Sequence, residues 1–163
     1  YTNGSVCGFT SPRWTLEYCI AMSGISEDFH KAVHYGKKIL NAKEYISLTE
    51  EKIAEANQSV EEETRQWNDL PQWKKAYNIY NLMLNNDGRS GLKAIVAQCL
   101  ASVLRWKISE IPKDFTQEKM FDLDLYGLKT DERKKSELKT LIEQDSFLRY
   151  IVKAIKYAAG EAV

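Results

Sequence analysis

Apolar residues recur every three or four positions along most of this chain, which is the spacing of an amphipathic α-helix. Runs of β-branched residues, which several buried parallel strands would need, are absent. The only strand signal is a short one at 6–9. We therefore predict a mainly α-helical domain of six or seven helices, with at most this one short N-terminal strand. The expected helical segments are 11–24, 26–43, 50–67, 72–86, 90–108, 131–143 and 146–158.

Helix-capping residues indicate where several of these helices begin. Ser11 followed by Pro12 predicts the N-cap and the first position of the first helix. Ser26 precedes two acidic residues, which favour the positive end of a helix dipole. Pro71 should end or kink the third helix.

The predicted helix at 50–67 is unusually polar. Residues 50–63 hold six glutamates against one lysine. Its apolar stripe is thin, and such a helix usually projects into solvent or crosses between domains. Within one helical domain, 1–163, we therefore expect 44–88 to be a helical insertion. The residues of the stripe are Ile53, Ala56, Val60 and Trp67.

Composition and charge narrow the class of protein. A hydrophobic content of 44% and a charged content of 28% are typical of a soluble globular domain. The net charge of zero argues against a domain that binds nucleic acid unaided, because phosphate neutralisation supplies most of that affinity. The sequence shows neither a membrane-spanning stretch nor a signal peptide, so we expect no membrane partner.

The cysteines and the first residue suggest where the protein works and how complete the chain is. Cys7, Cys19 and Cys99 are odd in number and widely spaced, which is typical of buried free thiols in a reducing compartment. We therefore expect a cytoplasmic protein. Because the chain begins with Tyr1 and not with methionine, we expect it to be a piece of a longer one.

His30 and His34 are four residues apart, so they share one face of a helix. Such a pair can bind zinc or another transition metal. The HExxH form is absent because residue 31 is lysine, and the sequence predicts no third strong ligand. A half-exposed structural pair is the preferred interpretation, and a histidine metalloenzyme is a third class to test.

Two further patterns favour structural roles. Asp122 and Asp124 alternate as the carboxylates of a Mg²⁺ site do, but no glycine turn or apolar strand flanks them, so capping aspartates in a loop are expected. Aromatic residues recur at helical spacing in the middle of the chain, which favours a place in the core over base stacking. These aromatic residues are Trp67, Trp73, Tyr77 and Tyr80.

Two segments carry a more specific pattern, "WTLEYCIAMS" at 14–23 and "GLKAIVAQCLAS" at 91–102. The second segment predicts a helix with an apolar stripe, formed by Leu92, Ile95, Val96, Cys99, Leu100 and Val103. Alanines beside this stripe leave room for close approach of another group. Lys93 lies in its first turn, where the helix dipole slightly disfavours a cation. That position suits a lysine well if a phosphate docks at the helix N-terminus.

Together these segments resemble the overcoming-lysogenization-defect (OLD) nucleases, which join an ABC-type ATPase to a C-terminal Toprim nuclease. That family carries a "T-[LF]-E-Y-D-L-A" segment after its Toprim core, and later a helix of the form "K-G-x-F-A-Q-x-L-A". Thr15, Leu16, Glu17 and Tyr18 match the first pattern, and Lys93 begins the match to the second. Cys19 replaces the aspartate of the family, and Val96 replaces its phenylalanine.

The resemblance implies that this chain is the C-terminal part of a metal-dependent DNA endonuclease. Glu17 would contribute to a Mg²⁺ or Mn²⁺ site, and Lys93 would act as a catalytic residue that stabilises charge on the scissile phosphate. ATP would bind only to the N-terminal domain, which this chain lacks, and DNA only to the intact protein. A homo-oligomer formed through the parent protein and a role in phage defence, common for such nucleases, stay open. The chain alone should cleave nothing.

The alternative is a non-enzymatic, all-α protein-interaction domain. It would bind a partner through the acidic helix at 50–63, or through the region of Trp67 and Trp73. The two interpretations differ on one point of geometry. A nuclease fragment should bring Glu17 and Lys93 together at one surface concavity, whereas an interaction domain has no reason to do so.

Overall fold

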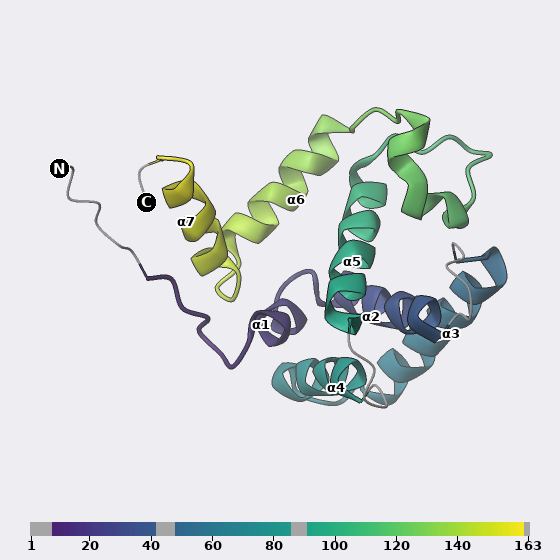
Figure 1. Cartoon of the computed structure of the whole chain (residues 1–163). Helices are drawn as coiled ribbons and strands as arrows, with labels where there is room; N and C mark the ends of the chain where they lie inside the picture. Colours follow the sequence, from purple (N-terminus) through teal and green to yellow (C-terminus); the bar gives the residue numbers. More distant parts are fainter. Residues whose placement is uncertain (1–7, 42–47, 86–90, 162–163) are drawn as a thin grey trace.

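The computed structural model describes residues 8–41, 48–85 and 91–161. Within these ranges the chain forms α-helices and one 3-10 segment and no β-strand, so the mainly α-helical fold is confirmed (Figure 1). Of the predicted strand at 6–9, the first two residues lie outside the described ranges, and Gly8 and Phe9 are not in a strand. The elements are α1 (Leu16–Met22), α2 (Ser26–Asn41), α3 (Glu50–Gln66), α4 (Gln72–Leu84), α5 (Leu92–Ile108), η1 (Gln117–Tyr126), α6 (Glu132–Gln144) and α7 (Arg149–Ala158).

The first helix begins later than the sequence predicted. Its N-cap is Thr15, whose Oγ1 accepts a hydrogen bond from the backbone N–H of Tyr18 at 3.2 Å. Ser11 does not cap a helix, because its hydroxyl donates to the carbonyl of Arg13 and the chain bends there. The prediction of a helix start at Ser11 and Pro12 was therefore wrong, and Glu17 lies in the first turn of α1.

The core lies where α5 crosses α2 (Figure 1). Gly36 makes this crossing possible, because a Cβ atom at that position would lie 2.8 Å from Cγ2 of Val96. Phe29 of α2 is 2% exposed in the same core. The predicted apolar stripe of α5 is confirmed as a core face, with Leu92, Val96, Cys99, Leu100 and Val103 buried.

The acidic helix α3 packs along α2 and does not project into solvent alone. Its predicted apolar stripe is confirmed, with Ile53, Ala56 and Val60 buried. Helix α4 packs on α1 and α2, so residues 50–84 share one core with the N-terminal helices. The division of the chain into an insertion at 44–88 stays a prediction.

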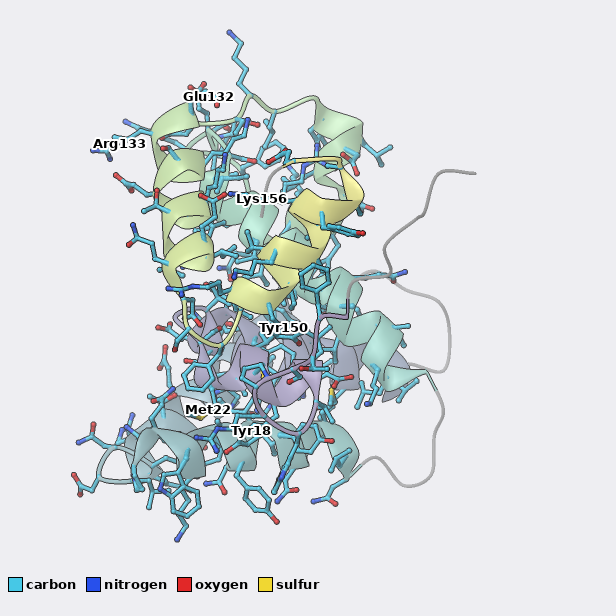
Figure 2. The ribbon with its side chains drawn as sticks, turned by 90° about the vertical axis from the view of Figure 1, so that its left-hand side faces the viewer. Tyr18, Met22, Glu132, Arg133, Tyr150 and Lys156 are labelled. Atoms are coloured by element: carbon cyan, nitrogen blue, oxygen red, sulfur yellow. The ribbon has the colours of Figure 1, made fainter. Side chains whose placement is uncertain are left out.

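Helices α6 and α7 lie side by side and are bridged by an ion pair of 3.2 Å between Lys156 and Glu143 (Figure 2). Neither helix has a buried residue. The turn between them holds them to the rest of the chain, because Asp145 accepts a hydrogen bond from the backbone N–H of Gly24 at 2.8 Å.

Candidate functional site

Glu17 of α1 and Lys93 of α5 form an ion pair, with Lys93 Nζ 2.9 Å from Glu17 Oε1. The Thr15 cap fixes Glu17 in the first turn of α1. Gly91 is the N-cap of α5 and has a φ of 99°, a conformation that glycine adopts without strain, so Lys93 lies in the first turn of α5. Two helix N-termini therefore bring together the two residues that the resemblance singled out.

Both partners keep their charges at neutral pH. Partial burial is the largest single effect on the Glu17 carboxyl and raises its pKa, but the hydrogen bonds from Lys93, from the backbone and from Thr15 together hold that pKa below its ordinary value. The hydrogen bond to Glu17 raises the pKa of Lys93 despite slight desolvation. The site thus presents an ionised carboxylate beside an ammonium group.

The fold does not depend strongly on this pair. The side chain of Lys93 is 57% exposed and that of Glu17 is 22% exposed. Ion pairs this open to water contribute about 0–1 kcal/mol, because solvent screens the attraction and ordering the side chains costs entropy. Changes at Lys93 should therefore leave the protein folded.

The pair lies at the rim of a concavity of about 310 Å³ between α1 and α5. Its walls are apolar apart from the ion pair, and the small side chains of Ala97 and Ala101 on α5 keep it open. The lining residues are Leu16, Glu17, Ile20, Phe29, Met83, Lys93, Val96, Ala97, Leu100, Ala101 and Leu104.

Of the several ligands that a divalent-metal site needs, the residues at this concavity supply one. Among the residues described, Glu17 is the one carboxylate that lines it. A hard carboxylate oxygen suits Mg²⁺ or Mn²⁺, but one such ligand holds neither ion firmly. Cys19, which stands where the OLD nucleases have an aspartate in the segment that this chain resembles, is fully buried with Sγ 2.9 Å from Ser11 Oγ, and it does not line the concavity.

A second cluster joins α2 to α3. Oε2 of Glu63 lies 2.6 Å from Nε2 of His30 and 2.9 Å from Nε2 of His34. The histidine side chains are only 3% and 11% exposed, so the expectation of a half-exposed pair was wrong. Within the described residues, these three form the group of potential metal ligands whose donor atoms converge. Sequence reasoning missed Glu63, although its spacing from Val60 and Trp67 places it on the apolar stripe of the helix, unlike Glu61 and Glu62 beside it.

His30 is held rigidly and kept neutral. Its ring stacks on Trp67, with centroids 5.1 Å apart and planes at 20°. Burial lowers the pKa of His30 below its ordinary value, and this effect outweighs the opposing attraction of Glu63. A cavity of about 140 Å³ borders His30 and Trp67.

This neutral histidine makes stability depend on pH. The folded state disfavours protonated His30, so the unfolded chain binds the proton more readily. The free energy of unfolding should therefore be highest above the ordinary histidine pKa of about 6.5 and fall as pH drops from there to the lower pKa of the folded state. The charged and titratable groups that act on His30 are His34 and Glu27 of α2 and Glu63 of α3.

Urea denaturation between pH 7.5 and about 5 measures this loss in the free energy of unfolding. In a His30→Gln variant, the free energy of unfolding should fall less steeply as the pH drops. An equal slope in that variant would assign the pH dependence to other groups.

The other residues that the sequence singled out do not lie at either of these two sites. Asp122 and Asp124 lie inside the 3-10 segment η1, which kinks at Asp122, so the prediction of capping aspartates in a loop was wrong. Asp124 pairs with Arg105 of α5. The prediction of an aromatic core holds for Tyr80, which is 9% exposed, but not for Trp73 and Tyr77, which are 57% and 40% exposed.

The buried thiols agree with the sequence prediction where the structure describes them. Cys19 and Cys99 are unpaired and buried, and burial raises the pKa of Cys99 to about 12. A thiol with so high a pKa is a weak nucleophile, because the thiolate is the reactive form. Cys7 lies outside the described residues.

Comparisons of this chain with protein-family models, with curated proteins and with solved structures find no match. None of the helices in the described ranges has the length and apolar character that crossing a bilayer requires.

Proposed function

We propose that this chain is the helical C-terminal part of an OLD-like, Toprim-type DNA endonuclease, and that it contributes Glu17 and Lys93 to a site completed by residues outside the chain. The observation that carries the proposal is the 2.9 Å pair between these residues at the rim of a concavity. They were selected from two separate sequence segments by their resemblance to one family. Their convergence in space is an independent property of the fold.

Lys93 is suited to hold a phosphate in place. An ammonium group has three N–H donors, and Glu17 takes one of them, which leaves donors for a phosphate oxygen on the exposed side. The N-cap Gly91 has no side chain to accept the first-turn N–H groups of α5. An anion at this helix end would therefore meet both a fixed cation and the backbone N–H groups of the first turn.

Glu17 has two roles in this proposal. Its carboxylate orients the lysine and, with acidic ligands outside the chain, would hold a divalent cation. When bound, that cation would supply Lewis-acid activation for phosphodiester hydrolysis. Lys93 stabilises the negative charge that develops on the scissile phosphate.

The apolar walls of the concavity are also an argument that a further protein segment packs against them. Leu16 lies at the edge of the concavity and is 45% exposed. A leucine side chain stabilises a fold more when another part of the protein buries it. In the proposed nuclease, the rest of the Toprim core would pack here. The zero net charge agrees with a piece that does not hold DNA unaided.

Glu17→Gln in the intact protein tests the proposal. We expect nicking of supercoiled plasmid DNA to fall about 100-fold, on the scale of losing one electrostatic contact to the transition state, and to require more Mg²⁺ or Mn²⁺. Glu27→Gln is the matched control, because Glu27 also pairs with a lysine, Lys31, at 2.8 Å but lies on α2 away from the concavity. Equal activity in the two variants would contradict the proposal.

The alternative, a non-enzymatic all-α interaction domain, is favoured by a different surface. A mainly apolar cleft of about 480 Å³ lies between α6 and α7, and Ile155 at its edge is 63% exposed. A partner helix could cover this cleft. This alternative predicts that changes at Glu17 and Lys93 leave the protein's activity unaltered.

A further inference from the structure

We propose that His30, His34 and Glu63 bind a Zn²⁺ ion that joins helices α2 and α3. This inference is independent of the proposed nuclease function, since the cluster shares no residue with the Glu17 and Lys93 site.

The donor atoms already point at one place. Both imidazole Nε2 atoms lie within hydrogen-bond distance of the same oxygen of Glu63, and the three donor atoms all lie within 4.8 Å of one another. Ligands of a tetrahedral zinc ion at about 2.0–2.1 Å are roughly 3.4 Å apart. To admit the ion, the Glu63 oxygen has to withdraw from each Nε2 atom by less than about 1 Å, and the two Nε2 atoms, at most 4.8 Å apart, have to approach each other by at most about 1.4 Å. The Glu63 side chain is 24% exposed, so it has room to withdraw.

The chemistry of the set favours zinc over magnesium. Two imidazoles and one carboxylate are the protein ligands of many zinc sites, whereas Mg²⁺ prefers oxygen ligands and keeps its waters. On binding, each imidazole presents the lone pair of Nε2 to the metal and carries its proton on Nδ1.

The surroundings complete a shielded site. His30 is 2% exposed, and Trp67 covers one face of its ring. Three protein ligands leave the fourth position of a tetrahedral zinc ion to a water molecule. A bound ion would add to the polar links between α2 and α3, which include the Lys38–Glu55 ion pair and the hydrogen bond from Tyr35 to Asn57.

Zinc titration of the full chain by calorimetry tests this inference, with Cys7→Ser as the background so that this thiol does not compete. We expect one Zn²⁺ per chain, no comparable binding of Mg²⁺, and an affinity at least about 100-fold weaker in Glu63→Gln, since even indirect ligand supports change metal affinity 10–100-fold. Glu62→Gln is the matched control, because it makes the same change of charge one residue away, where Glu62 pairs with Gln58. Circular dichroism of each variant confirms that it is folded.

Imidazole ¹H–¹⁵N spectra provide a second readout that does not depend on a variant. The chain has only two histidines, so both rings can be followed directly. We expect the Nε2 resonances of His30 and His34 to move together at one equivalent of Zn²⁺. Unmoved imidazole resonances, or equal zinc affinity in Glu63→Gln and Glu62→Gln, would overturn the inference.

Discussion

Replacing Lys93 by alanine in the intact protein is expected to lower DNA cleavage by about 100-fold or more, on the scale of losing one preorganised charge at the transition state. Stability should hardly change. The Lys93 side chain is 57% exposed, and its pair with Glu17 contributes about 0–1 kcal/mol. For a domain of this size we expect a melting temperature within about 3 °C of the parent. Plasmid nicking and thermal denaturation on the same preparations measure both quantities.

Lys107→Ala is the matched control for this prediction. Lys107 lies on the same helix, is 55% exposed and pairs with Asp28 at 2.8 Å, but it does not line the concavity. Its loss should leave cleavage unchanged. Lys93→Arg keeps the charge and should retain part of the activity, although the larger guanidinium places it differently. Full activity in Lys93→Ala would remove Lys93 from the proposed site.

Phe29→Ala should have the largest effect on stability, a loss of about 3–5 kcal/mol in the free energy of unfolding. Phe29 is 2% exposed and packs in the core beneath the concavity. Removing its ring leaves a void that the crossing of α2 and α5 cannot close, because Gly36 and Val96 already hold these helices in close contact. The loss is large against a total stability of about 5–15 kcal/mol for a domain.

Urea denaturation measures this loss, and Trp73→Ala provides the comparison. Trp73 also carries a large aromatic ring, but it is 57% exposed, so its replacement should change the free energy of unfolding by less than about 0.5 kcal/mol. Similar losses in the two variants would show that the core does not lie where α2 meets α5.

The helical fold could be predicted from the sequence because its evidence is local. The stripe of Ile53, Ala56 and Val60 identified the buried face of α3, and the stripe on α5 identified the core. Helix ends were less certain, because several residues near the start of α1 can cap a helix. Thr15 is the residue that does so, and the hydroxyl of Ser11 bonds to the chain beside it. Aromatic spacing was misleading at Trp73, since a periodic stripe does not show how far a partner helix covers it.

Contacts between helices far apart in the chain could not be predicted from local pattern. Glu17 and Lys93 were singled out only through the resemblance to the OLD nucleases, and their 2.9 Å contact depends on how α1 and α5 pack. The histidine pair was visible as an i, i+4 spacing, but its third partner lies on another helix. Helical spacing separates Glu63 from the neighbouring glutamates, but only the packing of α3 on α2 shows that it meets the histidines.

The central claim is that this chain completes a nuclease site whose other acidic residues lie upstream. Reading the coding sequence 5′ of the Tyr1 codon tests it most directly. The account predicts an ABC-type ATPase, then a strand carrying a glutamate and a strand ending in D-x-D, in the same reading frame. A start codon just before Tyr1, or an unrelated domain in that place, would contradict it, and Lys93 would then be an ordinary surface lysine of a helical domain.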